Sequence, residues 1–253
     1  MPQPRTIKPL GQPFIELSSI DSTNNYARTL IREGKGQHGM AIFTYDQTAG
    51  KGQRGKVWET EKGMNLALSL LVKPDFLTIS QQFQLSVVTA LACYDFFSQY
   101  AIEDTKIKWP NDLYWQDRKA GGILIESIVS ESGKWEWAII GIGINLNQVV
   151  FPENLPNPVS LRQITGKTFE GKKCAEELAF LLSKRYDQLQ TTGFEELHKN
   201  YLLHLYKKGD AVRLKKNAAA FMAKIETVTP QGELIITHAI TEAIQFGEIE
   251  WLK

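Results

Sequence analysis

Hydrophobic side chains recur at helical spacing in three long segments of the chain, residues 79–100, 173–189 and 194–205. In the first segment, the apolar positions that share one helix face are Ile79, Phe83, Val87, Leu91, Tyr94 and Phe97. Spacings of three and four residues place side chains on one side of an α-helix, and Thr78 or Ser80 is a suitable N-cap residue. The pattern therefore predicts three helices.

A shorter helix is predicted near the beginning of the chain. Asp21 or Ser22 would cap it, because side chains of this kind accept hydrogen bonds from the first helical N–H groups. Gly34 or Gly36 would end it. The run DSTN at residues 21–24 could also bind a polar ligand through its hydroxyl and amide groups, so both interpretations stay open.

Short apolar runs bounded by turn residues predict strands at 40–47 and 65–73. Four more runs follow residue 104 and are separated by short turns, which is typical of an antiparallel meander. These runs are residues 105–109, 113–115, 122–129 and 135–147. Their strands are apolar at nearly every position, so helices are expected to cover one face and another element to shield the other.

After Gly209 the pattern changes to short strands only, with turns at Asn217 and Gly232. About fifty residues of short strands predict a small separate barrel. We therefore expect a large domain over residues 1–205 and a small domain over residues 206–253. The predicted fold class is α+β, with an antiparallel sheet and helices on one face.

The composition argues against several classes of protein. Hydrophobic residues make up 43% and charged residues 23% of 253 residues, as in ordinary globular proteins. Lysine plus arginine total 29 against 28 acidic residues, so no global basic field is available to hold nucleic acid. No signal-peptide pattern and no membrane-spanning run is visible, so we expect a cytoplasmic protein. Cys93 and Cys174 are expected to be buried, reduced thiols, and the four histidines show no zinc spacing.

The run TAGKGQRGKVW, residues 48–58, predicts a flexible cationic loop. Glycines let a backbone turn sharply and approach a ligand, and the neighbouring cations suit anionic oxygens. These residues are Gly50, Gly52 and Gly55 with Lys51, Arg54 and Lys56. The loop lacks the Gly-Lys-Ser/Thr ending of a Walker A motif. A phosphate-binding loop and a basic surface turn both remain open at this point.

The run KWPNDLYW places Asn111 and Asp112 at a turn where a strand ends. Asp112 could hold Mg²⁺ beside a nucleotide, since Mg²⁺ prefers one or two carboxylates together with substrate phosphates. A turn rich in Asn and Asp for conformational reasons is the alternative. That alternative leaves Lys108 and Trp109 unexplained.

Two further runs combine glycines with a polar side chain. RKAGGILIE places Lys119 before Gly121 and Gly122, which would let a substrate approach the backbone; an exposed turn lysine is the alternative. GIGINLN delivers Asn145 at the end of an apolar strand that glycines would otherwise weaken. No nucleophile is apparent, so catalysis by positioning and charge neutralisation at a phosphate is favoured.

Taken in order, these runs resemble the ligand-binding segments of biotin protein ligases. The matching segments are DSTNNYA, DQTAGKGQRGKVW, KWPNDLYW, DRKAGGILIE and GIGINLN. The resemblance implies that residues 1–205 are a catalytic domain with a mixed sheet and helices on one face, like that of class II synthetases, followed by an SH3-like domain. It also implies two steps, in which biotin and ATP give biotinyl-5′-adenylate and pyrophosphate, and a lysine of a carrier domain then takes the biotinyl group. The implied cofactors are ATP and Mg²⁺, with biotin as substrate.

The resemblance also assigns roles to residues. Positions matching the family's biotin site are Ser22, Thr23, Asn24, Gln47, Lys51, Gly52, Gln53, Lys119, Gly121 and Gly122. Positions matching its ATP site are Arg54, Lys56, Trp58, Asn111, Asp112 and Asn145, with Asp112 as the metal ligand. Lys119 and Arg54 are the expected catalytic residues. Phe151 lies where the family has a loop that orders over adenine.

One position departs from the family, because Gln53 stands where an arginine is usual. The expected partner is the biotin carboxyl carrier domain of acetyl-CoA carboxylase or a similar enzyme, with no nucleic acid and no membrane. A lipoate or octanoate ligase or transferase of the same fold is the alternative enzyme. A biotin-sensing repressor is disfavoured, because the twenty residues before Asp21 are fewer than a helix-turn-helix domain needs. A homodimer through an edge strand stays open.

Overall fold

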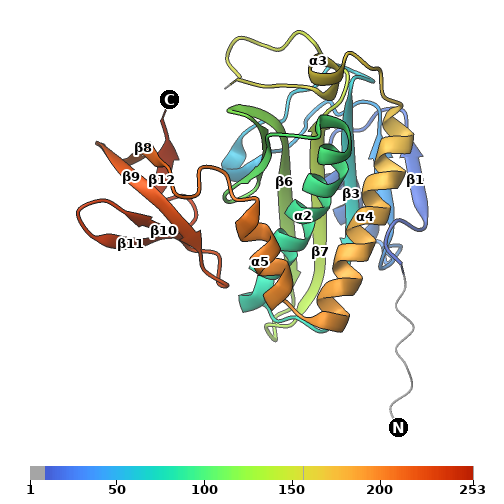
Figure 1. The fold of residues 1–253 in the computed structure, drawn as a ribbon. Helices are drawn as coiled ribbons and strands as arrows, with labels where there is room; N and C mark the ends of the chain where they lie inside the picture. Colours follow the sequence, from blue (N-terminus) through green and yellow to red (C-terminus); the bar gives the residue numbers. More distant parts are fainter. Residues whose placement is uncertain (1–8, 156, 253) are drawn as a thin grey trace.

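The computed structural model describes residues 9–155 and 157–252, which form two β-sheets and their flanking helices (Figure 1). The larger sheet has seven strands in the order β1-β2-β3-β7-β6-β5-β4. Its strands are β1 (Phe14–Leu17), β2 (Ala41–Thr44), β3 (Asn65–Val72), β4 (Thr105–Lys108), β5 (Asp112–Trp115), β6 (Arg118–Val129) and β7 (Trp135–Asn145). The predicted meander is confirmed, since β4 to β7 pair antiparallel in sequence order.

The sheet is mixed because β1 and β2 pair in parallel, while all its other neighbours are antiparallel. At its centre, β3 and β7 are buried along most of their length, which explains their nearly continuous apolar sequences. Their polar ends, Asn65 and Asn145, pair with each other, so they lie at the same end of these two central strands. Polar residues of several segments meet at this end of the sheet.

Helices cover one face of the sheet, as predicted. They are α2 (Gln82–Ala101), α3 (Leu161–Thr165), α4 (Gly171–Thr192) and α5 (Glu195–Leu203). The predicted start of α2 is confirmed in part: Thr78 forms a capping box with Gln81, and the 3₁₀ turn η2 (Ile79–Gln81) precedes the α-helix. Buried side chains of α2 and α4 share one core with β3 and β7. This core holds the sheet rigid beneath the site.

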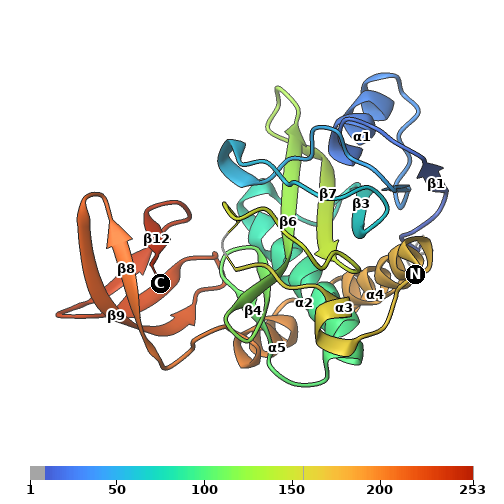
Figure 2. The same cartoon turned by 90° about the horizontal axis from the view of Figure 1, so that it is seen from above.

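The opposite face carries the short helix α1 (Thr23–Arg32) (Figure 2). A second, smaller core lies beneath it, made of Ala27, Leu30, Met40, Ile42, Leu71, Trp137 and Ile139. A short amphipathic helix must bury its apolar stripe, and this part of the sheet offers apolar side chains for it. Helices therefore cover one face fully and the other face partly.

The second sheet has the strand order β11-β10-β9-β8-β12 and consists of antiparallel pairs, as expected for an SH3-like domain. Its strands are β8 (Ala211–Lys216), β9 (Ala219–Val228), β10 (Leu234–Thr237), β11 (Thr241–Ile244) and β12 (Ile249–Trp251). The predicted turns are confirmed at Asn217 and Gly232, both with positive φ. Strand β11 was not predicted, because TEAI alternates without a run of apolar residues. The boundary near residues 205–208 stays a prediction.

Both cysteines are buried and free, as predicted. Burial raises the pKa of Cys93 well above its usual value and that of Cys174 to about 11, so neither thiol is activated. Among the described residues, no helix combines the length and the hydropathy needed to cross a bilayer.

Candidate functional site

A cavity of about 1260 Å³ opens where the large sheet, the glycine loop and the small domain meet. Nearly every site residue expected from the sequence lines it. These residues are Ser22, Thr23, Asn24, Gln47, Lys51, Gly52, Gln53, Arg54, Lys56, Trp58, Asn111, Asp112, Lys119, Gly122 and Asn145. Gly121 does not line it, because Gly121 is buried in the sheet against the backbone of Gly143. Phe151 also lies at the cavity, on the loop that follows β7.

One wall of the cavity is polar and starts at α1. Ser22 occupies the N-cap position, which confirms the predicted start of the helix, but its side chain does not make the expected capping hydrogen bond. Gln47 takes that role instead: its Oε1 accepts from the backbone N–H of Thr23 at 3.0 Å and lies 3.1 Å from the Thr23 hydroxyl. The side chains of Ser22 to Asn24 are thus left to face the cavity.

Two glycines of β7 are needed because side chains lie directly on the strand. A Cβ at Gly141 would come within 2.5 Å of Asn24 Oδ1, and one at Gly143 within 2.5 Å of the Trp58 ring. The polar wall and Trp58 therefore rest on bare backbone. This explains the GIGIN pattern, which the sequence suggested only as a close approach.

The glycine loop is folded back on itself. Gly52 N–H donates to Lys56 O at 2.7 Å, and Trp58 N–H donates to Gly50 O at 2.9 Å. Arg54 adopts a left-handed backbone (φ 55°) at the tip. Its guanidinium donates to the carbonyl of Gly247 in the small domain at 2.8 Å. The loop thus joins the two sheets across the cavity.

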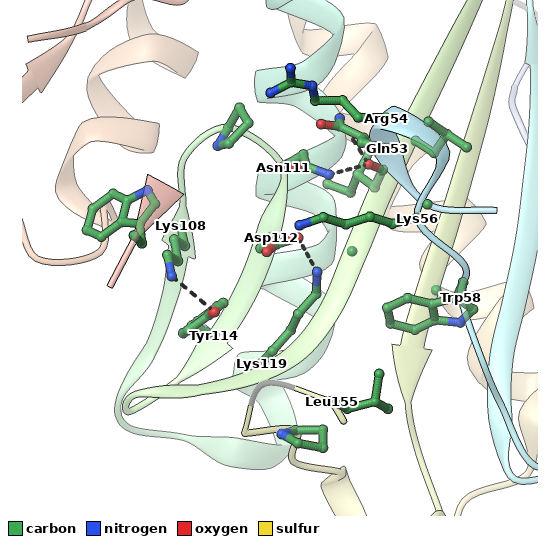
Figure 3. A pocket seen from close by; sticks show the side chains of 18 of the residues that line it. Gln53, Arg54, Lys56, Trp58, Lys108, Asn111, Asp112, Tyr114, Lys119 and Leu155 are labelled. Atoms are coloured by element: carbon green, nitrogen blue, oxygen red, sulfur yellow. Dashed lines mark hydrogen bonds and ion pairs between the residues drawn. The ribbon is translucent and has the colours of Figure 1, made fainter. Parts of the chain in front are cut away.

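Lys119 and Asp112 form the charged centre of the cavity, where Nζ lies 2.6 Å from Oδ1 and both side chains are about three-quarters buried. Figure 3 shows Lys56 and Lys119 both pointing toward Asp112, while Arg54 points away from it. The Lys119 ammonium also lies 5.9 Å from the centre of the Trp58 ring. Lys119 is therefore not a solvated turn lysine.

The two asparagines bind backbone carbonyls. Asn111 Nδ2 donates to Ile123 O at 2.7 Å. Asn145 Nδ2 donates to Lys119 O at 3.3 Å and to Val159 O at 3.1 Å. Backbone carbonyls thus orient both amide groups beside Asp112 and Lys119.

Lys108 and Trp109 are the residues whose role sequence reasoning missed. Lys108 Nζ donates to the Tyr114 hydroxyl at 3.1 Å and lies over the rings of Tyr114, Tyr206 and Trp251. Burial lowers the Lys108 pKa to about 8. Trp109 Nε1 donates to Gly232 O at 2.9 Å. Both side chains therefore join the large sheet to the small domain, and the KW before the Pro-Asn-Asp turn was their only sequence signal.

Two buried polar atoms in the cavity, Trp58 Nε1 and Gln53 Oε1, have no hydrogen-bond partner among the described residues. Buried polar atoms are normally paired, so these two are exceptions within the cavity lining. No cluster of three or more His, Cys, Asp or Glu side chains that could hold a metal ion occurs in the described ranges. Asp112 offers a single carboxylate, which fits Mg²⁺ bound mainly through substrate phosphates.

Comparisons with known proteins agree on this region. Residues 16–145 match the model of the biotin/lipoate A/B protein ligase family. A biotin–[acetyl-CoA-carboxylase] ligase of Paracoccus denitrificans is 32% identical, over 87% of this chain and 92% of its own length. A bifunctional ligase/repressor BirA of Bacillus subtilis is 29% identical, over 95% of this chain and 74% of its own length. A biotin protein ligase from Aquifex aeolicus, solved with biotin and ATP, superimposes with a TM-score of 0.79 at 26% identity, covering 94% of this chain and 98% of its own.

Proposed function

The chain belongs to the biotin/lipoate A/B protein ligase family, and on this premise we propose that it is an ATP-dependent biotin protein ligase. It joins biotin to ATP to form biotinyl-5′-adenylate and pyrophosphate. It then transfers the biotinyl group to a lysine of a biotin carboxyl carrier domain. One observation carries the proposal: a single cavity connects the polar wall at Thr23 and Asn24 to the cations around Lys119.

The polar wall suits a ring that carries hydrogen-bonding groups. Thr23 and Asn24 are 3% exposed and yet line the cavity, so a ligand there is largely removed from water. Hydrogen bonds in such a place discriminate strongly, because an unpaired buried group is costly. This favours biotin over octanoate, which has no polar group at its distal end.

The charged centre suits the first step. The carboxylate oxygen of biotin attacks the α-phosphorus of ATP, the bond from that phosphorus to the bridging oxygen breaks, and pyrophosphate leaves. In this proposal Lys119 neutralises both anions as they approach; its ion pair with Asp112 and the direction of Lys56, which points to the same carboxylate, support this role. Preorganised cations of this kind stabilise charge in the transition state without reorganisation.

Asp112 would hold Mg²⁺ together with the phosphates of ATP, and the ion would neutralise phosphate charge. In the described structure this carboxylate pairs with Lys119, so it is already oriented toward the reacting groups. Trp58 and the loop that carries Phe151 both line the cavity and, in this proposal, enclose the nucleotide. Exclusion of water protects a reactive acyl-adenylate.

In the second step, the neutral amine of the carrier lysine attacks the acyl carbon, the bond to the AMP oxygen breaks, and a proton is released. The test is mass spectrometry of a biotin carboxyl carrier domain incubated with the protein, ATP, Mg²⁺ and one acid. With biotin, the carrier should gain one biotinyl group. Modification with lipoate or octanoate but not biotin would replace this proposal with the alternative ligase.

A further inference from the structure

Gln148 is a buried side chain in the loop after β7, and it does not itself line the cavity. It is 5% exposed, so the protein must supply the hydrogen-bond partners of its amide. Its Oε1 accepts from the backbone N–H of Glu61 at 3.2 Å and from Asn65 Nδ2, and its Nε2 donates to Val150 O at 3.0 Å. One side chain thus joins three segments: the segment after the glycine loop, the start of β3 and the loop after β7.

Backbone groups fix the direction in which the Gln148 amide faces. A backbone N–H only donates and a carbonyl only accepts, so the amide oxygen must face Glu61 and the NH₂ group must face Val150. Asn65 agrees with this direction, because its own Oδ1 accepts from the backbone N–H of Leu146 at 3.1 Å and its NH₂ group therefore faces Gln148. The residue that joins these segments must accept on one side and donate on the other, and glutamine does both.

The hydrogen bond to Val150 is the last one before the part of the loop that lines the cavity. Phe151, Asn154 and Leu155 line it. Among the described residues, those from 151 to 155 form hydrogen bonds only within their own loop. The position of Phe151 therefore depends on the carbonyl group that immediately precedes it, which Gln148 holds.

On its other side, Gln148 holds the segment that carries Trp58. Trp58 and Glu59 line the cavity, and the backbone N–H of Glu61 follows two residues later. Two aromatic side chains that line the cavity, Trp58 and Phe151, thus belong to segments that one buried amide joins.

We propose that Gln148 is a positioning residue that holds Phe151 in place relative to the Trp58 segment, so that the two segments together bind the base of the nucleotide. This inference rests on the proposed function, in which both segments enclose ATP. Gln148 touches neither substrate and acts through the backbone of Val150 and Glu61. The base takes no part in the bond changes at the α-phosphorus, so contacts with it stabilise the bound substrate and the transition state equally.

The test is Gln148→Met, which nearly keeps the length of the side chain and removes its hydrogen bonds. The KM for ATP in pyrophosphate formation should rise roughly 5- to 15-fold, as expected for one lost hydrogen bond. The kcat should stay within about twofold of the parent, because the loss of uniform binding raises KM alone. The KM for biotin should also change less than about twofold. A merely structural role would instead reduce the fraction of active protein, which lowers kcat and leaves KM unchanged.

The adjacent Asn147 offers a matched control. It is 6% exposed, and its amide both donates to and accepts from the backbone of Phe169 at 2.8 Å. This amide joins the end of β7 to the segment before α4, which does not line the cavity. Asn147→Leu removes a buried amide just as Gln148→Met does, so both variants should lower the melting temperature. In Asn147→Leu, however, the KM for ATP should stay within about twofold of the parent.

If Gln148→Met does not fold, Gln148→Glu serves instead, because an ionised carboxylate still accepts from Glu61 and Asn65 but cannot donate to Val150. It should raise the KM for ATP in the same way. An unchanged KM for ATP in a folded Gln148→Met or Gln148→Glu overturns the inference, as does an equal rise in the KM for biotin or in Asn147→Leu. A parent that forms no pyrophosphate from biotin and ATP would overturn the proposed function itself.

Discussion

Lys119 is held in place before substrates arrive. Its ammonium pairs with Asp112 at 2.6 Å, and its backbone N–H and carbonyl bind Asn157 and Val159 on the returning loop. The strand, the loop and the carboxylate thus fix one flexible side chain from three sides. Such preorganisation is what makes a single cation effective at a phosphate.

We expect Lys119→Ala to slow pyrophosphate formation from biotin and ATP by roughly 10²–10³-fold, the usual effect of losing one preorganised donor. The melting temperature should change little, since the side chain is not part of the core. As a control, Lys172→Ala removes another ion-paired lysine, whose Nζ lies 2.7 Å from Glu16 Oε2, and it should leave the rate unchanged. A rate within a few-fold of the parent in Lys119→Ala would contradict the role.

The Lys108 side chain is buried among aromatic rings, and its pKa is lowered. Burial among Tyr114, Tyr206 and Trp251 lowers its pKa to about 8 from 10.5. Between these two values the unfolded chain binds a proton that the folded protein has lost. The free energy of unfolding contributed by this group therefore rises with pH across that window.

The prediction compares the parent with Lys108→Met, which keeps the length of the side chain but removes the charge. From about pH 8 to pH 10, the parent should gain roughly 1–3 kcal/mol of stability relative to the variant. Urea unfolding at several pH values measures the difference, and contributions from the cysteines and from tyrosines that do not contact Lys108 cancel in it. A constant difference across the window would show that Lys108 keeps its proton in the folded protein.

At the scale of elements, β7 works as a platform whose glycines admit Asn24 and Trp58. The sequence of the strand is otherwise apolar and buried, so the platform is rigid. Alternation along the strand places the two glycines on the same face. The position of the Trp58 ring is therefore set by β7 rather than by the glycine loop that carries it.

We expect Gly143→Ala to displace Trp58, because the new Cβ would lie 2.5–2.7 Å from three atoms of its ring. The tryptophan fluorescence spectrum should shift. Because the chain has 6 tryptophans, the contribution of Trp58 is obtained by subtracting the spectrum of the Trp58→Phe variant. Gly122→Ala meets the same ring at 3.5 Å, which is ordinary contact, and should leave the fluorescence unchanged. An unshifted spectrum in Gly143→Ala would mean that the backbone of β7 moves and the Trp58 ring does not.

The glycine loop presents Lys51, Arg54 and Lys56 as exposed neighbours. Like charges repel until anions arrive, so biotin and ATP together should order the loop. Trypsin should cut after these residues in the free protein and much less with both substrates present. Cutting at the exposed Lys35, outside the cavity, should not change. Equal cutting of the loop under both conditions would count against closure.

At the scale of the whole molecule, the small domain completes the cavity and is fastened to the large sheet. Arg54 donates a hydrogen bond to the carbonyl of Gly247, and Trp109 donates one to the carbonyl of Gly232. The Lys108 ammonium lies over the ring of Trp251. The β4 edge of the large sheet is also paired, because Ile107 exchanges backbone hydrogen bonds with His204 and Tyr206. The two sheets should therefore unfold together.

Calorimetry should show one unfolding transition in the parent. Trp109→Ala removes a nearly buried side chain that contacts the small domain, so the transition should split into two. Trp135→Ala creates a similar cavity within the large sheet alone, where Trp135 Nε1 binds Trp137 O, and should lower a single transition. A single transition in Trp109→Ala would show that the other contacts suffice.

The sequence by itself determined the elements and most of the site. Helical and strand periodicity depend on neighbours three, four or two positions away, so α2, α4 and the meander could be read directly. The glycine loop, the Pro-Asn-Asp turn and Lys119 could also be recognised, because each is a local run with unusual composition. The family resemblance followed from their order along the chain.

Only the tertiary structure decided which distant side chains meet. Asn24 and Glu126 are 102 positions apart, and Arg54 and Gly247 are 193 apart, with no local pattern to announce either contact. The same holds for the burial of Lys108 among aromatic rings, since burial lowers its pKa. These contacts form because packing two sheets and a helix brings particular faces together, and that depends on the whole core rather than on any one segment.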